Sequence, residues 1–565
     1  MMLPLLMMVG MAQQDPLAPL VVPVPPVVQV QAPAPLPYAP TIPLIVPIDW
    51  RAEFAAIRKG DWAGAAAGIA ALPDGPLKAV AKAELYTAKG SPTVSGDELQ
   101  ALIGEAPEMA QAEQLERLAA SRGSIQMMAT PERPVVSLSS ATRRGRARAV
   151  LGDKEADQLR VRLDPLLKLD LADAAEALMF QSAPMMTPEG RAEAGQRVAW
   201  SYYSLGRDAD AVRVAEAGRA GASGDWAVAS AWVSGLASWR QNDCAAAGLR
   251  FREVAGGARE SELVAAANYW AARSAQACRQ PMAVAPLLRE AARSTESFYG
   301  LVARETLGMA TSMSAFAQAD AEIVAMLPNV RRAEALVGIG ERALAEEALR
   351  HQSRIGRPSD QRALIAVARR LDLAGAQYWL ATNGQPGTAV EAAARYPRPR
   401  WIPQNGWRID PALAFGHVIQ ESNFRDRAVS AAGAVGLMQV RPGTAGDTAR
   451  ARATLFDPVS LTEPTINLDY GQAFIEVLRQ QPATRGQLPR VIAAYNAGPM
   501  PVDRWGAIND RGDPLLWIES IPYWETRYYV PAVMRNMWVY QGLAGDKQPS
   551  LVALAEHKWP AFPTR

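Results

Sequence analysis

Cysteine and histidine are scarce in this sequence, which has two cysteines and three histidines among 565 residues. Two cysteines cannot build a disulfide framework or a four-ligand zinc site. Three histidines leave little room for metal chemistry. We therefore expect no metal and no cofactor, and if the chain is an enzyme we expect carboxylates to be its reagents.

An excess of charge of one sign is also lacking. The 59 Lys and Arg residues against 57 Asp and Glu leave a formal net charge of +2, so nothing indicates a nucleic-acid or other polyanionic partner. Hydrophobic residues at 49% and charged residues at 21% are close to globular averages. These values exclude global disorder, collagen and a polytopic membrane protein.

The apolar N-terminal segment, residues 1–12, is too short to span a bilayer, whose core needs about 20 apolar residues. We expect no integral membrane span. Residues 1–12 resemble the apolar part of a secretory signal peptide, with Gly10 and Ala12 as the small residues before a cleavage site. No Lys or Arg precedes Arg51, so the basic part of a signal is missing. A start codon placed too far downstream would explain this, and a disordered apolar tail is the alternative.

Residues 13–48 contain a proline every few positions between Pro16 and Pro47. Each proline fixes φ and removes a backbone donor, so neither a helix nor a central strand can form. We expect an extended, polyproline-II-like linker of up to about 3 Å per residue.

Between Trp50 and about Ala394 the sequence is rich in Ala, and Gly, Pro or Asp recur at intervals that suit helices of about 10 to 18 residues. Three similar helical hairpins follow one another, led by Trp200, Trp232 and Trp270. Their turns, at Gly206, Asn242 and Gln280, are roughly 35 to 38 residues apart, which is typical of helical-hairpin repeats and predicts a long, curved α-solenoid. We interpret the three tryptophans as repeat core and not as a platform for sugars.

The two cysteines occupy related places in these repeats. Cys244 opens the second helix of one hairpin, and Cys278 closes the first helix of the next. The two helices should run antiparallel, which puts both sulfurs at the same end. A disulfide is geometrically reasonable in an exported protein, and two small buried thiols are the alternative.

The composition changes near Tyr396, where YPRPRWIP resists helix formation and the Ala-rich periodicity fades. The fold class that we predict is mainly α. We expect these segments: a signal peptide at 1–12, a Pro-rich linker at 13–48, an α-superhelical domain at 49–308, a helical linker domain at 309–395 and a compact domain at 396–565.

In the last domain, Asp410 and Pro411 predict the start of a helix that runs through PALAFGHVIQES and carries Glu421 in its last turn. A carboxylate there faces the negative end of the helix dipole, and apolar neighbours would desolvate it. Both effects raise its pKa, as a general acid near neutral pH requires. His417 lies one turn earlier, and we interpret it as a core or rim residue without a catalytic role.

Three further motifs follow the Glu421–Ser422 pair in order. GLMQ, with PGTA after it, supplies Met438 as an apolar wall and Gln439 as an amide for a sugar hydroxyl or acetamido group. AAYNAGP places Tyr495 and Asn496 before a turn, and ESIPYWETRYYV brings acids and aromatic rings together. Rings that stack on sugar faces, beside amides and acids, indicate a carbohydrate cleft.

This ordered set, which begins with the ES pair at Glu421, resembles the soluble lytic transglycosylase family. The resemblance implies a lysozyme-like C-terminal domain that cleaves the β-1,4 bond between N-acetylmuramic acid and N-acetylglucosamine in peptidoglycan and leaves a 1,6-anhydromuramic end. Glu421 would be the sole catalytic acid and then the base towards the C6 hydroxyl. Positions that would line the groove are Ser422, Ser430, Met438, Gln439, Tyr495, Asn496, Glu519 and Tyr529. Tyr495 is placed to hydrogen-bond near the acid.

The resemblance further implies peptidoglycan strands as substrate, a periplasmic location, and other cell-wall enzymes as candidate partners. Arg441 stands where the family commonly has methionine, and Asp426 where it has proline. A goose-type lysozyme-like hydrolase and a non-catalytic glycan-binding scaffold are the alternatives. Asp447, Asp457 and Asp469 are the candidates for the second acid of a hydrolase, and we interpret them as loop and cap residues.

Overall fold

The computed structural model describes residues 49–124, 127–138, 144–311, 313 and 320–563. The predicted signal peptide at 1–12 and the predicted linker at 13–48 lie outside these residues. Within them the chain forms 26 α-helices and one two-stranded antiparallel pairing. The mainly α class is therefore confirmed.

Two separate segments of the chain together form the first group of helices. The first passage contains α1 (Asp49–Lys59), α2 (Trp62–Ala71), α3 (Pro76–Thr87), α4 (Gly96–Glu105), α5 (Ala112–Ser121) and β1 (Val136–Ser137). The second contains α15 (Pro328–Gly338), α16 (Arg342–Ile355), α17 (Gln361–Arg370), α18 (Ala374–Thr382) and β2 (Asn383–Gly384), where β2 pairs with β1.

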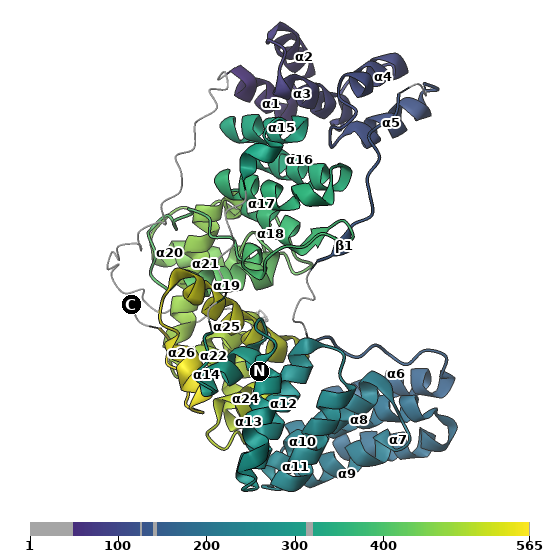
Figure 1. Ribbon diagram of the computed structural model, residues 1–565, viewed down its shortest axis with the longest axis vertical. Coiled ribbons are helices and arrows are strands. Elements are labelled where there is room, and N and C mark those ends of the chain that lie inside the picture. The colour runs from purple at the N-terminus through teal and green to yellow at the C-terminus, as the bar shows by residue number, and fades with distance from the viewer. Residues whose placement is uncertain (1–48, 125–126, 139–143, 312, 314–319, 564–565) are drawn as a thin grey trace, which may run out of the picture.

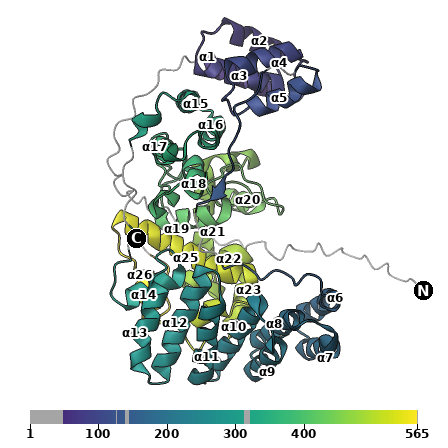
Figure 2. The same cartoon turned by 45° about the vertical axis from the view of Figure 1, so that its right-hand side comes forward.

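The helical hairpins of the superhelix lie between these two passages. They are α6 (Lys154–Lys168), α7 (Ala172–Ser182), α8 (Pro188–Ser204), α9 (Asp208–Arg219), α10 (Gly224–Arg240), α11 (Cys244–Gly257), α12 (Ser261–Ala277), α13 (Pro281–Ala292) and α14 (Phe298–Thr306). In Figures 1 and 2 this row occupies one end of the molecule, and α1–α5 with α15 and α16 occupy the other.

The C-terminal helices lie between the two ends (Figure 1). They are α19 (Pro411–Ser422), α20 (Pro442–Ala451), α21 (Pro464–Gln480), α22 (Leu488–Ala497), α23 (Pro499–Arg504), α24 (Pro514–Glu519), α25 (Trp524–Ala544) and α26 (Pro549–Ala555). None of the helices in the described ranges is long and apolar enough to cross a bilayer.

Two hydrophobic cores organise these helices. One joins α1–α5 to α15–α18, and the other joins α6–α14 to the C-terminal helices. Apart from Ala374, which contributes to the second core, the core changes along the chain between Ala119 and Ala156, between Ala303 and Val324, and between Ala394 and Tyr396. The last two changes fall near the predicted boundaries at 308 and 395. The change between Ala119 and Ala156 lies inside the segment that we predicted as one superhelical domain at 49–308. Helices α1–α5 of that segment share their core with α15–α18, which are far away in the sequence.

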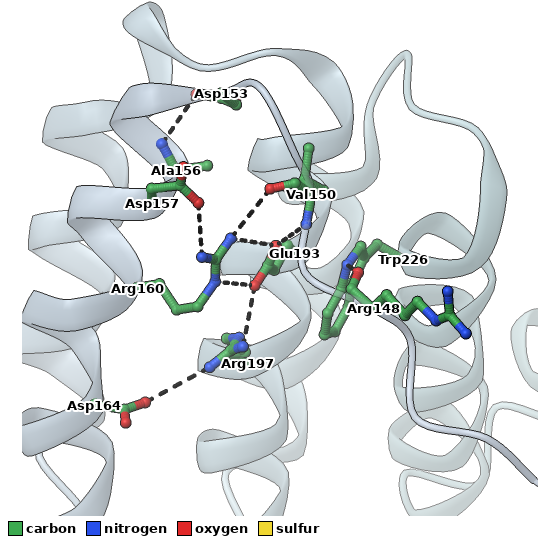
Figure 3. A network of polar contacts seen from close by, with 10 residues as sticks. All are labelled: Arg148, Val150, Asp153, Ala156, Asp157, Arg160, Asp164, Glu193, Arg197 and Trp226. Carbon is green, nitrogen blue, oxygen red and sulfur yellow. Dashed lines mark hydrogen bonds and ion pairs between the residues drawn. The ribbon is translucent and has the colours of Figure 1, made fainter. Parts of the chain in front are cut away.

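Residues 148–150, which lead from β1 into the superhelix, are bound to the superhelix by polar contacts (Figure 3). Glu193 of α8, which is buried, accepts a hydrogen bond from the Val150 amide at 2.8 Å and pairs with Arg160 of α6 at 2.6 Å. The indole of Trp226 donates to the Arg148 carbonyl at 2.7 Å. These bonds fix the path of residues 148–150 and bring Arg144 to the C-terminal domain.

The superhelix and the C-terminal domain share a tight interface. Phe298 of α14 stacks on Trp538 of α25 with ring centroids 5.1 Å apart, and Tyr203 shares a hydrogen bond with Ser520 at 2.8 Å. Figure 2 shows α10–α14 standing beneath α25. Because these contacts are buried, the orientation of the C-terminal domain on the superhelix is fixed by packing.

The structure joins Cys244 and Cys278 in a disulfide, with Cα atoms 5.6 Å apart. Cys244 is the first residue of α11 and Cys278 follows the last residue of α12. Antiparallel packing of α11 on α12 brings these ends together.

Candidate active site

Glu421 lies in the last turn of α19, as the sequence predicted. Asp410 caps the start of the helix, where its carboxylate accepts a hydrogen bond from the Ala412 amide at 2.8 Å. The helix ends after Ser422, where Asn423 adopts a left-handed conformation with φ 52°. These local signals fix the depth at which the Glu421 side chain enters the domain.

A close approach of α19 to α25 supplies the partner of Glu421. A Cβ on Gly416 would lie 3.0 Å from the Val533 carbonyl oxygen, and Asn536 donates to the Gly416 carbonyl at 3.2 Å. Glycine therefore lets the two helices pack closely enough for Tyr529 of α25 to reach the acid. The Tyr529 hydroxyl donates to Glu421 Oε1 at 2.5 Å.

The electrostatic surroundings favour a protonated Glu421. Burial raises its pKa from the usual 4.5 to about 7, and the hydrogen bond from Tyr529 acts in the opposite direction. The negative charge of Glu525 raises the pKa further. A carboxyl that keeps its proton near neutral pH can act as a general acid.

Tyr495 has a different role from the one that its sequence position suggested. Its hydroxyl donates to the Met438 carbonyl at 2.8 Å, and its ring lies 4.5 Å from that of His417. Tyr529, and not Tyr495, forms the hydrogen bond to the acid. Tyr495 instead ties the 435–440 loop to the helix pair α19 and α22.

The loop that contains Met438 and Gln439 is held by a residue that sequence analysis missed. Asn467, which is fully buried, accepts from the Met438 amide at 2.8 Å and donates to the carbonyls of Val435 and Leu461, each at 2.8 Å. A Cβ on Gly436 would lie 2.2 Å from Asn467 Nδ2, so glycine is required there. Nothing in the sequence around an isolated asparagine near a helix start indicates this role.

Three predicted groove residues are held within the loop, two by hydrogen bonds and one by burial. Gln439 Nε2 donates to the carbonyls of Ala428 and Gly436 at 3.1 and 2.9 Å. Ser430 Oγ accepts from the Ala434 amide at 3.0 Å. Met438 is fully buried beneath the loop. These side chains shape the loop beside the acid.

Two of the predicted groove residues, Ser422 and Glu519, are buried in the structure. Ser422 is 1% exposed and donates to the Val418 carbonyl at 3.2 Å. Glu519 is also 1% exposed, and it binds Arg144 Nη1 at 2.7 Å and the Tyr299 hydroxyl at 2.9 Å. Glu519, the last residue of α24, thus joins the C-terminal domain to Arg144 and to Tyr299 of α14.

Asn496 lies at an accessible edge of the site. Its amide donates to Glu525 Oε1 at 3.2 Å and its carbonyl oxygen accepts from Thr526 Oγ1 at 2.6 Å. These three side chains border a cavity of about 1330 Å³ between the C-terminal domain and the superhelix. Asn496 and Glu525 thus connect the surroundings of the acid to this cavity.

Aromatic and basic side chains line the cavity on the superhelix side. Trp200 and Trp232 both border it, and Arg527 of α25 lies 3.5 Å above the Trp200 ring. Trp270 is fully buried in the core. The prediction that the tryptophans are repeat core therefore fits Trp270, whereas Trp200 also faces open space at the interface.

The aspartates that the sequence offered as a second acid are bound elsewhere. Asp469 is buried between Arg408 and Arg452, which hold its pKa below the usual value against the effect of burial. Asp457 caps a short turn through the Val459 amide, and Asp447 pairs with Arg450. In the described ranges, no group of three or more His, Cys, Asp or Glu side chains is placed to hold a metal ion.

The fold and the site together define a helical domain that holds a half-buried carboxyl with a raised pKa and is docked on an α-superhelix. Residues 402–518 match the family model of the transglycosylase SLT domain. The matched segment includes Glu421, Gln439, Tyr495 and Asn496.

Relatives of known name share this part of the chain. The soluble lytic murein transglycosylase of Escherichia coli (strain K12) is 35% identical over 155 residues, which cover 27% of this chain and 24% of the relative. The enzyme of the same name from Salmonella typhimurium is 33% identical over 159 residues, with coverage of 27% and 24%. The membrane-bound lytic murein transglycosylase C of Haemophilus ducreyi is 37% identical over 100 residues, with coverage of 16% and 27%. The chain thus spans about a quarter of the length of these curated relatives.

Structural similarity over most of the chain is found with a solved structure. The crystal structure of the 70 kDa soluble lytic transglycosylase of Escherichia coli aligns with 91% of this chain and 99% of its own, at a TM-score of 0.57 and 16% identity. The two chains share their fold, which confirms the predicted arrangement of an α-superhelix followed by a lysozyme-like domain.

Proposed function

We propose that this protein is a peptidoglycan lytic transglycosylase that cleaves the β-1,4 bond between N-acetylmuramic acid and N-acetylglucosamine. The observation that carries the proposal is the half-buried Glu421 carboxyl, whose pKa is raised to about 7 and which accepts a hydrogen bond from Tyr529. It lies in an SLT domain whose named relatives are murein transglycosylases.

In the proposed reaction Glu421 donates its proton to the glycosidic oxygen as the bond to C1 of the muramic residue breaks. The carboxylate then takes the proton from the C6 hydroxyl of the same sugar, whose oxygen bonds to C1. Ring closure within one sugar uses proximity and needs neither a positioned water nor a nucleophilic second carboxylate. The engagement of Asp447, Asp457 and Asp469 in structural contacts supports a mechanism with one acid.

The cavity of about 1330 Å³ offers room for a polymeric substrate, and Glu525 on its border lies near enough to Glu421 to raise the pKa of that carboxyl. Trp200, Tyr523, Arg146 and Arg504 line this cavity. Sugar rings can stack on the two aromatic rings, and the two guanidinium groups can pair with carboxylates of a bound strand. We propose that the superhelix places the strand while the C-terminal domain cuts it. The periplasm is the proposed location, and other cell-wall enzymes are candidate partners, because both follow from a peptidoglycan substrate.

Digestion of purified sacculi tests the function directly. Mass spectrometry of the released muropeptides should find 1,6-anhydro ends, which are one water lighter than hydrolysed ends. Glu421→Gln should lower the rate by about 10²-fold to 10⁴-fold or more, because one group serves as both acid and base, while binding to sacculi is retained. Hydrated reducing ends would instead support a lysozyme-like hydrolase. No release at all by the wild type would leave a glycan-binding scaffold.

A further inference from the structure

His417 of α19 has no part in the proposed acid chemistry, yet its ring is enclosed in the site. It is 1% exposed, and its Nδ1 lies 2.7 Å from the Tyr529 hydroxyl oxygen. Tyr495 packs against one side of the imidazole, with ring centroids 4.5 Å apart. Burial of a polar ring is unfavourable unless the ring is hydrogen-bonded. The contact with Tyr529 is therefore a hydrogen bond, and its donor and acceptor have to be assigned.

The hydrogen atoms can be assigned from the two distances. A phenol has one hydrogen, and Tyr529 donates it to Glu421 Oε1 at 2.5 Å. The Tyr529 oxygen can then only accept from His417, which requires the hydrogen of the neutral imidazole to be on Nδ1. Burial lowers the pKa of His417 to about 3, so the ring is neutral at any working pH.

We propose, on the basis of the transglycosylase function above, that His417 is a positioning residue that acts on Glu421 through Tyr529. Its Nδ1–H fixes the Tyr529 oxygen, and the Tyr529 hydroxyl in turn fixes Oε1 of the acid. Oε2 is thereby the oxygen that carries the proton. It gives this proton to the glycosidic oxygen as the bond to C1 breaks, and it takes the C6 hydroxyl proton as the new bond to C1 forms.

Directional bonds of this kind affect both geometry and acidity. A carboxyl that turns freely would present the wrong oxygen, and a displacement of about 1 Å at a reacting group can cost about 10²-fold in rate. Donation by His417 also strengthens the donation by Tyr529, since linked hydrogen bonds polarise one another. The chain His417–Tyr529–Glu421 therefore holds the acid in place and tempers the rise in its pKa.

Other groups around the carboxyl act independently of His417. Glu525 of α25 raises the pKa of Glu421 by its charge, and the Tyr495 hydroxyl of α22 is occupied by the Met438 carbonyl. Neither contact involves the Nδ1 hydrogen. A change at His417 should thus be transmitted through Tyr529.

A pair of amide substitutions separates positioning from packing. His417→Asn places an N–H the same number of bonds from the backbone as Nδ1, whereas His417→Gln places it where Nε2 lies. We expect His417→Asn to keep kcat within about threefold of wild type. We expect His417→Gln and His417→Leu to lose about 10-fold to 100-fold in kcat, with KM within twofold and the alkaline limb of the pH profile about one unit higher.

Tyr529→Phe should move the alkaline limb of the pH profile to higher pH in the same way. When His417→Gln is added to Tyr529→Phe, the limb should move no further. His351→Leu serves as the control, because His351 is also buried but pairs with Glu132 far from the site. It should change neither kcat nor the pH profile. Circular dichroism and melting temperature establish that each variant is folded.

Equal losses in His417→Asn and His417→Gln, or a lower kcat with an unmoved alkaline limb, would overturn the proposal and leave a packing role. If His417→Leu fails to fold, the Asn and Gln pair decides. Failure of the proposed function has a separate signature: wild-type protein would then form hydrated ends, and the comparison of the His417 variants would be made on that hydrolysis.

Discussion

Replacement of Glu519 by alanine should destabilise the protein far more than loss of an ordinary ion pair does. Glu519 is 1% exposed, and both of its oxygens lie within 2.9 Å of Arg144 Nη1. Its removal leaves that guanidinium enclosed and unpaired, and it also removes the acceptor of the Tyr299 hydroxyl. Breaking a buried pair from one side costs about 3 to 5 kcal/mol.

The neighbouring charge makes the loss larger. Arg527 is held near Arg144, and burial followed by the charge of Arg144 lowers its pKa to about 9. Without Glu519 the two cations face each other with no carboxylate between them. For a cooperative unit of this size, about 1 to 2 °C of melting temperature corresponds to 1 kcal/mol, so we expect the apparent melting temperature of Glu519→Ala to fall by about 3 to 10 °C.

The measurement is thermal unfolding followed by circular dichroism at pH 7, with Glu113→Ala as the matched control. Glu113 pairs with Arg117 on the surface, where side-chain exposures are 60% and 68%, and such a pair contributes about 0 to 1 kcal/mol. KM for sacculi, measured well below the melting temperature, should not change. Equal melting temperatures for the two variants, together with a raised KM for Glu519→Ala, would refute the structural role and restore Glu519 as a substrate contact.

Three further outcomes are expected. Since the pKa of Glu421 is raised to about 7 and the acid must start protonated, activity should fall about tenfold per pH unit above 7; a flat profile from pH 6 to 9 would contradict this. The disulfide closes a separation of 34 residues, and its loss in Cys244→Ser should cost about 3 to 4 kcal/mol of stability. The variant should therefore melt at a lower temperature than the wild type under oxidising conditions, whereas the two proteins should melt alike after reduction. Residues 396–565 should fold and cut alone, more slowly on intact sacculi and with a lower melting temperature because Trp538 loses Phe298; an unfolded circular dichroism spectrum would contradict the boundary.

Much of the site follows from local signals in the sequence. Asp410 and Pro411 start α19, and the length of the apolar pattern puts Glu421 in its last turn, where the structure has it. Helix ends and turns depend on contacts between residues a few positions apart, so sequence patterns can predict them. The motifs with Gln439 and Asn496 also indicated which loops surround the acid.

Contacts between residues far apart in the chain were decided only by tertiary packing. Tyr529 is 108 positions from Glu421, and Arg144 is 375 positions from Glu519. Whether Tyr495 or Tyr529 reaches the acid depends on how closely α19 packs on α25 at Gly416, which no local pattern reports.

The same reason explains why the sequence predicted helices correctly and their grouping only in part. An amphipathic helix shows that one of its faces is buried, but not which other helix covers that face. The sequence by itself therefore determined the helical class, the position of the acid and the order of the motifs. The packing of α1–α5 on α15–α18, the burial of Glu519 and the hydrogen-bonded partners of Glu421 were decided by the three-dimensional fold, because each requires surfaces that meet only after the chain has returned on itself.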